Sequence, residues 1–586
     1  MQKTRLLTMR FCGLALAALL SACGGGGGNS GSCSGSAAYC GQFASGPTAS
    51  TSPTTPTTPT APVTSPTTNP NSSVEYTESS LGSANAFAGQ CAAPRSAGSI
   101  DPLSSQPYGD KLGSLTTEKQ WIRAFVNDTY LWYKDVVPQD PGLFALGATA
   151  PYVNASDNSK TSVVLRTNFD VVDTYFNSLR STLFTSSGKP KDQFHFTYAT
   201  PEWVALSTSG DSVGFGFQVA LVAITPPRKA VVAYSEPSSP ASNNKLTRGA
   251  QILAVNGVDV ASGDAAVLNE GLFSPVAGKK YTFQVLDSGS TSTRTFDMTA
   301  TTVTSTPVQN VRTLAAPYTD VGYLQFNDHI ATSESQLISA VNQLKAANGG
   351  AGIADLVLDL RYNGGGLLSI ASELAYMIAG EAATRGKAFE TLSFNDKNPF
   401  GVTDADATTP FFKVTQGFST ARGVSLPQLN LPRVFVLTGG GTCSASEAIM
   451  NGLTGIGVEV IQIGNTTCGK PYGFIPQDNC SVTYFTVQFK GVNQAGFGDY
   501  ADGFAPSNKA NQANLLAGCV VADDFTKLLG DPTEARLAAA LQYRSTKTCG
   551  LTATSVPGLP ASAKRDVALG RSSIRENRIY TKGVGP

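Results

Sequence analysis

The sequence predicts a multidomain α/β protein whose largest part is a mainly parallel sheet. The chain has 586 residues, more than one hydrophobic core usually organises. From about residue 318, short apolar runs alternate with amphipathic stretches of helical period, as in repeated strand and helix units. Before that point, a stretch with helical spacing is followed by one rich in β-branched and turn residues, so two smaller domains precede the sheet.

Charge and composition exclude some classes of partner. Lys+Arg and Asp+Glu both number 42, so no net charge draws the chain to nucleic acid or to an anionic surface. The sequence contains no Cys-x-x-Cys pair and no His-rich segment, so no metal site is predicted. We therefore expect a partner that is selected by shape and local chemistry.

Residues 1–22 have the form of a signal peptide, with basic residues before the short apolar run FCGLALAALL. This run is too short to span a bilayer. Leu-Ser-Ala-Cys, ending at Cys23, resembles a bacterial lipobox, which implies a lipid on the Cys23 sulfur and a place in the bacterial cell envelope, facing the periplasm or the surface. The alternative is an ordinary secretory signal. In both cases we expect an oxidising compartment, where the eight cysteines after Cys23 can pair.

Two segments precede the β-rich region. Residues 23–90 are rich in Gly and then in Pro, Thr and Ser, which predicts a flexible tether without a core. Residues 91–205 are predicted to form a small N-terminal helical domain, because apolar residues recur at helical spacing in 116–136 and 163–184.

Residues 206–302 resemble a PDZ domain. The loop Gly214-Phe215-Gly216-Phe217 precedes a strand-like run, and a Gly-Ala-Gln-Ile-Leu-Ala-Val-Asn-Gly hairpin follows at residues 249–257. In this interpretation the loop amides hold a peptide carboxylate, and the neighbouring strand edge accepts the peptide by β-augmentation. The alternative is that the glycines serve only a turn.

Residues 303–550 carry the predicted parallel sheet, and the polar tail 551–586 has no assigned function. Strands are expected at 321–326, 355–362, 433–438 and 458–463, and helices at 333–347, 367–380 and 446–453. Gly-rich loops follow three of these strands, at 363–366, 439–447 and 464–470. Since parallel strands place their carboxyl ends at one edge of a sheet, we expect these loops to meet.

The segment GTCSASEAIMNGL has two interpretations. Ser444 and Glu447 have the spacing of a capping box at a helix start. Alternatively Ser444 is a nucleophile, in which case it needs a base. The two histidines, His195 and His329, have no recognisable triad setting, whereas a buried Lys470 would lose its charge and accept the serine proton. A solvated Lys470 is the simpler alternative.

The motifs LDLRYNGGG and TCSASE, a later Gly-Lys pair, the PDZ-like segment and the Trp-rich helical region occur in one collinear order. Together they resemble the carboxyl-terminal processing (tail-specific) protease family of Ser/Lys peptidases, over about residues 115–545. The resemblance implies a crotonase/Clp-protease-like peptidase core with Ser444 as nucleophile and Lys470 as base. It also implies an oxyanion hole formed by the amides of Ala445 and Gly365, with no metal or organic cofactor.

The chain departs from the family pattern near the proposed base. Many members carry a glutamine four residues after the lysine, where it orients the lysine; here that position is Phe474. The nearest glutamine is Gln477, and either Gln477 takes over this orienting role or no residue does. Cys443 and Cys468 stand beside the two proposed catalytic residues. A disulfide between them would hold the two loops in register.

The expected function is that of a lipid-anchored serine endopeptidase of the bacterial envelope, which cleaves extended or partly unfolded polypeptides through an acyl-enzyme. The PDZ-like domain would capture a chain terminus. One alternative is a catalytically inactive peptide-binding scaffold of the same fold, because the glutamine is missing. A second is a hydrolase of small esters, although such substrates need no terminus-holding groove. The sequence does not predict the oligomeric state.

Overall fold

The computed structural model describes residues 81–507, 514–550, 568–569 and 578–580. The predicted signal peptide, Cys23 and the predicted tether up to residue 80 lie outside the described residues. Within the described part of the chain, no helix is both long and apolar enough to cross a membrane.

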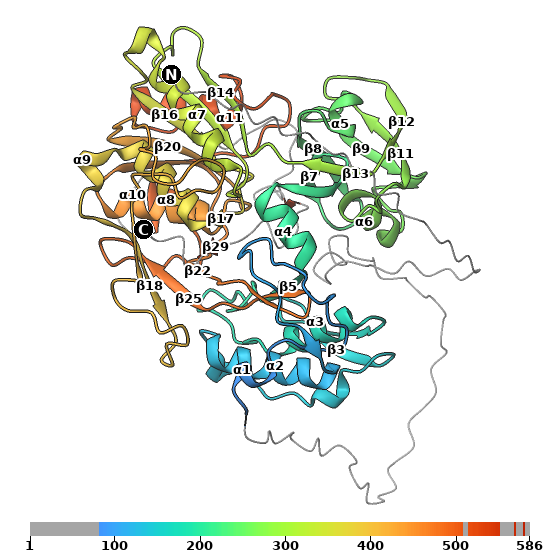
Figure 1. Ribbon diagram of the computed structural model, residues 1–586. Helices are drawn as coiled ribbons and strands as arrows, with labels where there is room; N and C mark the ends of the chain where they lie inside the picture. The colour runs from blue at the N-terminus through green and yellow to red at the C-terminus, as the bar shows by residue number, and fades with distance from the viewer. Residues whose placement is uncertain (1–80, 508–513, 551–567, 570–577, 581–586) are drawn as a thin grey trace, which may run out of the picture. The chain divides into compact units, whose positions relative to one another are not determined.

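The largest element is a seven-stranded sheet (Figure 1). Its strands are, in spatial order, β14 (Val308–Thr313), β15 (Val321–Phe326), β16 (Asp355–Asp359), β20 (Arg433–Thr438), β21 (Glu459–Gly464), β27 (Leu515–Val520) and β26 (Ala505–Ser507). Strand β14 is antiparallel to β15, and all the other neighbours are parallel. The prediction of a mainly parallel sheet is therefore confirmed.

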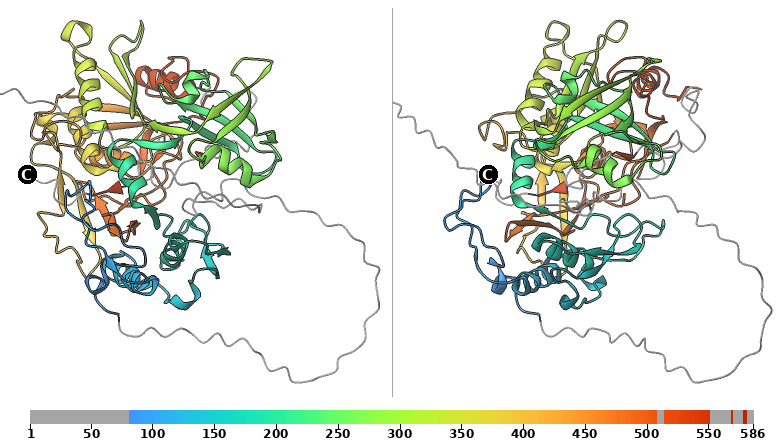
Figure 2. Two further views of the ribbon diagram at one scale, coloured as in Figure 1. Left: turned by 45° about the vertical axis from the view of Figure 1, so that its right-hand side comes forward. Right: turned by 90° about the vertical axis from the view of Figure 1, so that its right-hand side faces the viewer.

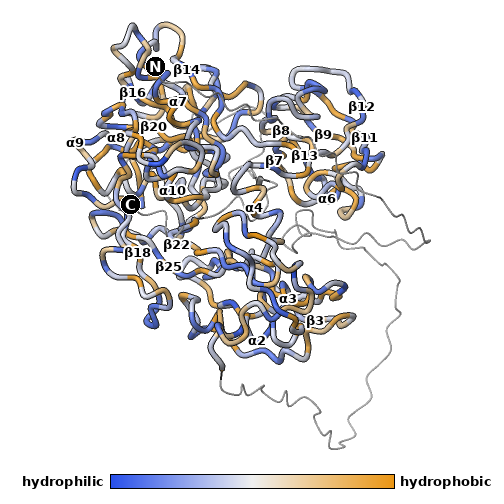
Figure 3. Tube along the Cα trace, viewed as in Figure 1, coloured by the Kyte–Doolittle hydropathy of each residue, from blue (hydrophilic) through white to orange (hydrophobic). Residues whose placement is uncertain are grey.

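Helices cover both faces of this sheet. They are α7 (Ser333–Lys345), α8 (Leu368–Ala379), α9 (Glu381–Thr384), α10 (Ala445–Gly455) and α11 (Ala535–Thr546). Leu356 and Leu358 of β16 pack with α7, α8 and α10, whereas Val357 packs with α11 on the opposite face, because successive strand residues point to opposite faces. Figures 1 and 2 show α11, in red, apart from α8 and α10. Figure 3 shows hydrophobic residues recurring along these strands and helices.

The N-terminal segment is mixed rather than helical. It contains α1 (Ala84–Phe87), α2 (Leu115–Thr129), α3 (Asn168–Ser178), α4 (Thr200–Thr208), the short helices η2 (Tyr133–Asp135) and η3 (Pro141–Leu143), and the strands β1 (Gln90–Cys91), β2 (Lys111–Leu112), β3 (Thr149–Val153), β4 (Lys160–Val164) and β5 (Phe196–Ala199). Capping boxes at Ser114 and Thr167 start α2 and α3. Helix α1 begins inside the predicted tether.

This segment does not form a helical domain of its own. Strand β5 pairs antiparallel with β24 (Val482–Phe485), far along the chain, and a disulfide joins Cys91 to Cys480. Buried residues of α2 and α3 belong to the same hydrophobic core as those of α8 and α10. The predicted helices thus form, but the expectation of a separate helical domain is corrected, because the apolar faces of these helices pack on the core that carries the large sheet.

A second sheet occupies the β-rich region, and it has its own hydrophobic core. Its strands run in the order β12 (Thr293–Thr299), β11 (Lys280–Leu286), β9 (Gln251–Val255), β8 (Lys229–Ser235), β7 (Phe217–Ala223) and β28 (Ala568–Leu569), with β10 (Val258–Asp259) beside β9. Helices α5 (Pro240–Asn243) and α6 (Ala265–Phe273) and the pair β6 (Asp211–Gly214) with β13 (Thr301–Thr304) complete this region.

The remaining short elements belong to neither of the two seven-stranded sheets. They are η4 (Asn348–Gly350), β17 (Gly366–Leu367), β18 (Ala388–Phe394), β19 (Thr408–Pro410), β22 (Tyr472–Gly473), β23 (Gln477–Asn479), β25 (Phe489–Val492) and β29 (Arg578–Ile579). Strand β29 lies within the tail that was predicted only as polar.

Two buried carboxyl groups face each other between α7 and α8. The amide of Gln416 donates to Glu334 Oε1 at 2.7 Å and to Glu373 Oε1 at 2.8 Å. Burial, together with the charge of Glu334, raises the pKa of Glu373 to about 9. Glu373 is therefore protonated at neutral pH in the folded protein, whereas an unfolded glutamic acid titrates near pH 4.3.

Because the folded state keeps this proton up to about pH 9, the contribution of Glu373 to stability is complete below its unfolded pKa and declines as pH rises towards 9. The decline is at most about 1.4 kcal/mol per pH unit. We expect Glu373→Gln to remove this decline. In urea titrations, the unfolding free energy of the variant should therefore rise relative to that of wild type as the pH increases from 5 to 8.5. Glu459→Gln, at a half-exposed carboxylate, is the control. Equal pH profiles for wild type and Glu373→Gln would contradict this assignment.

Candidate active site

Three loops meet at the carboxyl edge of the large sheet, as predicted. They follow β16, β20 and β21, which are consecutive neighbours in the sheet. The amide of Cys443 donates to Asn363 O at 3.1 Å, and the amide of Cys468 donates to Thr442 O at 3.0 Å. Ser446 Oγ also donates to Asn363 O, at 3.0 Å. The loop that contains Ser444 is thus bonded to both of its neighbours.

Ser444 has an unusual backbone conformation. Its φ is 61° and its ψ is −111°, a region that residues with a side chain rarely adopt, and it directly precedes α10. The side chain is fully buried, and among the described residues its Oγ has no hydrogen-bond partner. Strain of this kind persists where the surrounding structure enforces it, commonly at functional sites.

Glu447 connects the serine loop to the lysine loop. Its Oε2 accepts from the amides of Ser444 at 2.8 Å and Lys470 at 2.9 Å. Its Oε1 accepts from Thr467 Oγ1 at 2.5 Å and from the amide of Gly469 at 2.8 Å. Burial raises the pKa of this carboxyl, and the four hydrogen bonds act in the opposite direction.

Both contacts of the predicted capping box are present in outline, but only one of them is a full hydrogen bond. Glu447 reaches back to the Ser444 amide, but Ser444 Oγ does not cap the helix. The Ser-x-x-Glu spacing indicated the first contact. It could not indicate the contacts with residues 467–470, which lie one crossover later in the chain.

The disulfide between Cys443 and Cys468 is confirmed, with a Cα–Cα distance of 5.2 Å. It joins the residue before Ser444 to the residue two positions before Lys470. Two further disulfides, Cys91–Cys480 and Cys519–Cys549, are present in the described part of the chain. The Cys443–Cys468 disulfide thus adds a covalent link between the serine and lysine loops, which Glu447 already connects through hydrogen bonds.

Replacing both cysteines of this link by serine is expected to lower the unfolding free energy by about 3 kcal/mol. We also expect kcat/KM for the peptidase activity that the sequence predicts to fall about tenfold, because the two loops lose their common register. The double variant Cys519→Ser/Cys549→Ser is the matched control, since its bond closes a similar separation of 30 residues against 25. Chemical denaturation and turnover measured on both variants test this. An equal loss of activity in both would contradict a local role.

Lys470 is buried, with 1% of its surface exposed. Its Nζ lies 4.5 Å from the ring centroid of Phe194 and 4.2 Å from that of Phe474. Burial raises the pKa of the nearby Asp192 carboxyl, while the hydrogen bond from Tyr130 and, as the smallest of several further effects, the charge of Lys470 act in the opposite direction. The expectation of a solvated loop lysine is therefore excluded.

Two hydrogen bonds that the predicted roles of Lys470 call for are absent among the described residues. No hydrogen bond joins the Gln477 side chain to Lys470; Gln477 lies in β23, and its Nε2 donates to Pro476 O at 3.0 Å. The ring of Phe474 lies against the ammonium instead. Ser444 Oγ and Lys470 Nζ also form no hydrogen bond with each other in this structure. Neither histidine bonds to Ser444.

The predicted oxyanion donor Gly365 is not available in this structure. Its amide donates to Asn363 Oδ1 at 2.9 Å, and the same oxygen lies 2.9 Å from His329 Nδ1. Burial lowers the pKa of His329 to about 3, so the ring is neutral. Because Asn363 Oδ1 is an acceptor, Nδ1 carries the ring proton. Ala445 agrees better with expectation: its amide opens α10 and has no acceptor among the described residues.

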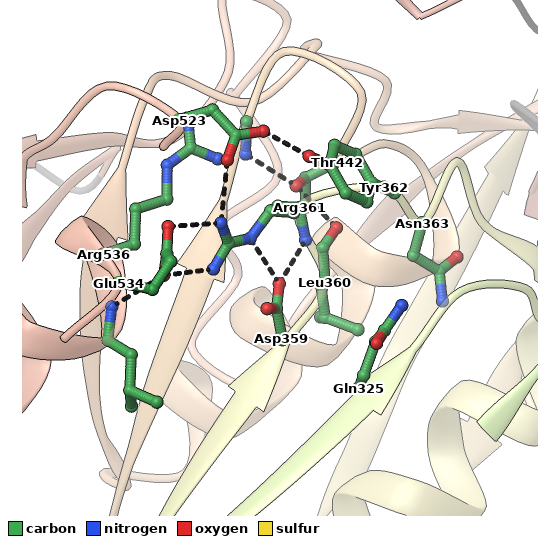
Figure 4. Close-up of polar contacts among 12 residues, drawn as sticks. Gln325, Asp359, Leu360, Arg361, Tyr362, Asn363, Thr442, Asp523, Glu534 and Arg536 are labelled. Carbon is green, nitrogen blue, oxygen red and sulfur yellow. Dashed lines mark hydrogen bonds and ion pairs between the residues drawn. The ribbon is translucent and has the colours of Figure 1, made fainter. Parts of the chain in front are cut away.

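A buried network of charged side chains lies beside the loop that contains Asn363. Figure 4 shows the Arg361 guanidinium between Asp359, Asp523 and Glu534, with distances of 2.7 to 3.0 Å. Arg248, from the β-rich region, reaches the same network through Asp523 at 2.6 Å and the Tyr362 hydroxyl at 2.5 Å. Burial would raise the pKa of Asp523, but the arginines hold it far below its usual range. The β-rich region and the region of the large sheet are thus joined at Tyr362, the residue before Asn363.

The loop Gly214-Phe215-Gly216-Phe217 leads into β7. Phe215 is buried in the core of the β-rich region. Gly216 has a φ of 80°, and a Cβ there would lie 2.2 Å from the Ser239 Cβ, so the turn requires glycine. The amides of Phe215 and Gly216 have no acceptor among the described residues. The need for glycine in this turn is therefore compatible with a role of the Phe215 and Gly216 amides in holding a peptide carboxylate.

Residues 320–473 match the sequence model of Peptidase family S41, and this stretch contains Asn363, Ser444 and Lys470. The chain carries a peptidase family S41 domain. The S41 domain thus spans the three converging loops, and the family resemblance inferred from the motifs is confirmed.

Individual relatives resemble the chain more broadly than the S41 domain alone. A carboxyl-terminal-processing protease of Picosynechococcus sp. is 27% identical over 268 residues, which are 45% of this chain and 56% of that protein, so the match spans about half of the relative. A crystal structure assigned to the S41 proteases, from Bacteroides fragilis, aligns with a TM-score of 0.50 and 22% identity, over 73% of this chain and 97% of its own. The photosystem II D1 C-terminal processing protease aligns with a TM-score of 0.39 and 18% identity, over 73% and 100%.

Proposed function

We propose that the chain is a serine endopeptidase that uses Ser444 as nucleophile and Lys470 as general base. The observation that carries the proposal is the strained, fully buried Ser444 at the start of α10, with a hydroxyl that forms no other bond among the described residues. A serine that served only as a helix cap would use this oxygen on the helix amides. The Glu447 bridge and the disulfide to the Lys470 loop add support.

The proposed reaction begins when neutral Lys470 takes the proton of Ser444 Oγ, which attacks the scissile carbonyl carbon. The C–N bond breaks, the amine leaves with the proton from Lys470, and water then hydrolyses the acyl-enzyme. The Ala445 amide at the helix N-terminus stabilises the oxyanion. Burial disfavours the charged form of Lys470, whereas the two aromatic rings favour it. Displacement of water by the bound substrate increases the effect of burial and so favours the neutral amine, which can act as the base.

Catalysis requires two local changes from the present geometry. Lys470 Nζ must come within hydrogen-bond reach of Ser444 Oγ, and a glycine amide of the loop 363–366 must become free. The Gly365 amide is released if it breaks its bond to Asn363 Oδ1. The buried network of Figure 4, which starts two residues before this loop, is placed to influence that step.

The β-rich region is proposed to be a PDZ-like domain that captures a chain terminus. The open amides of Phe215 and Gly216 precede β7, whose outer edge can accept an extended peptide. Polypeptides in extended or partly unfolded form are the proposed substrates. A lipid on Cys23 is proposed to anchor the protein in the bacterial envelope.

The test is labelling with a fluorophosphonate probe together with casein digestion. We expect the probe to modify Ser444, as located by peptide mass spectrometry, and both signals to disappear in Ser444→Ala. Ser446→Ala, which removes the competing serine of the same turn, is expected to keep both. Labelling of Ser446, or equal casein digestion by wild type and Ser444→Ala, would exclude this nucleophile. Peptide binding without digestion in wild type would favour the inactive scaffold.

A further inference from the structure

The described end of the chain lies between two of the active-site loops. Strand β29 pairs in parallel with β17, with Arg578 opposite Gly366 and Ile579 opposite Leu367, immediately after the Asn363 loop. On its other side Ile579 pairs with Phe474, and the Tyr580 amide donates to Phe474 O at 3.0 Å. The ring of this same Phe474 lies against Lys470 Nζ.

Side chains of this segment are packed rather than exposed. Ile579 is 3% exposed and lines a small cavity together with Trp203, Leu206, His329 and Leu367. The Tyr580 ring meets that of Phe489 edge-on, with 6.3 Å between centroids, and its hydroxyl lies 3.4 Å from Asp406 O. The segment thus fills a site in which apolar contacts and main-chain pairing act together.

An earlier part of the same tail occupies the edge of the β-rich region. Ala568 pairs with Leu221 and Leu569 with Ala220, antiparallel, on the side of β7 that β8 leaves open. This is the edge proposed above for peptide capture. Both places where a substrate main chain is expected to pair are therefore filled by the chain's own carboxyl-terminal segment.

We propose that two strands of the carboxyl-terminal segment, residues 568–569 and 578–580, are an intramolecular ligand of the substrate groove that competes with polypeptide substrates. Main-chain pairing to Gly366, Leu367 and Phe474 would be available to any extended peptide, so occupation by β29 and binding of a substrate exclude each other. The Ser444 hydroxyl, which has no hydrogen-bond partner among the described residues, belongs to this occupied form. The proposal rests on the proposed function, because it identifies the groove with the peptidase site.

The order of docking favours a competitor over a substrate. A chain captured by its carboxyl terminus at β7 would present residues that precede this terminus to Ser444. Here the earlier residues, 568–569, dock at β7 and the later residues, 578–580, lie at the catalytic loops. The tail therefore passes the two sites in the reverse order, so we expect it to stay intact.

The experiment places a charge in the packed tail of the full-length protein. Ile579→Asp buries a carboxylate among apolar side chains, which is expected to undock the segment and to raise kcat/KM for casein at least about tenfold, since a tethered ligand acts at a high effective concentration. Leu112→Asp, at a position 83% exposed, is the control for the same chemical change. Tyr580→Pro, which lacks the amide that donates to Phe474 O, is a second variant if Ile579→Asp unfolds.

A binding measurement separates this proposal from the proposed function. In the Ser444→Ala background, a fluorescent peptide of residues 564–586 is expected to bind Ile579→Asp and not the chain with the native tail, even if no variant digests casein. If casein digestion is Ser444-dependent but Ile579→Asp and Tyr580→Pro match wild type in both digestion and peptide binding, the tail is not a ligand of the groove. Ser444-dependent removal of the tail, seen by intact mass, would show it to be a substrate and overturn the competitor role.

Discussion

Lys470→Met and Ser444→Ala are each expected to lower kcat/KM for casein-derived peptides by at least about 10²- to 10⁴-fold, the contribution typical of a positioned general base. Methionine keeps the length and apolar contacts of the lysine stem between Phe194 and Phe474, and it removes only the amine. The two effects should not add in the double variant, because both residues serve one proton transfer. Steady-state kinetics on a fluorogenic peptide measure this.

A second buried lysine provides the control. Lys119 is 8% exposed, and its Nζ donates to the carbonyl oxygens of Pro141 and Phe144 at 2.5 and 2.8 Å. Lys119→Met is expected to cost stability but to keep kcat/KM within about threefold of wild type, because the residue touches no active-site loop. If Lys470→Met retained wild-type turnover, another group would have to serve as the base.

Glu447→Gln is expected to lower kcat/KM at least about 100-fold, the scale at which a misplacement near 1 Å affects catalysis. The glutamine amide would face backbone N–H groups that the carboxylate now accepts, so the amides of Ser444 and Lys470 lose their common partner. A charged hydrogen bond is worth about 1.5 to 3 kcal/mol, so stability should fall by several kcal/mol as well.

Glu334 offers a control with nearly the same environment. It is also fully buried, and it accepts four backbone amides, from Gln416, Gly417, Ser419 and Thr420, at 2.7 to 3.1 Å. Glu334→Gln should reduce stability by a similar amount while kcat/KM, measured where both variants are folded, changes little. Equal losses of activity in the two variants would show that Glu447 acts only through stability.

The local sequence pattern was sufficient to predict the large sheet. Alternating apolar and amphipathic segments predicted β15, β16, β20 and β21 with the helices between them, because the two periods differ and a parallel order follows from the crossovers. Helix bounds differed by one or two residues, as at α10, where Ser444 is the last residue before the helix. The same reasoning predicted that three loops share an edge.

Predictions that needed a partner from elsewhere in the chain were less reliable. Gln477 is the glutamine nearest to Lys470 in the sequence, but in the structure it lies in strand β23 and bonds to Pro476 O, while the Phe474 ring lies against Lys470. Gly365 was expected to be free, but Asn363, two residues earlier, binds its amide. Strand β29 has two residues, which are too few for any periodicity to reveal.

The sequence by itself determined the order of strands and helices, the glycine loops at the strand ends and the residue types available for acyl transfer, because these depend on local period and spacing. Only the tertiary structure decided that Glu447 joins the serine and lysine loops, that aromatic rings enclose Lys470, and that residues 578–580 lie beside them. Apart from the contact of Phe474 with Lys470, those contacts join residues 23 to more than 100 positions apart, and burial, not spacing, selects them.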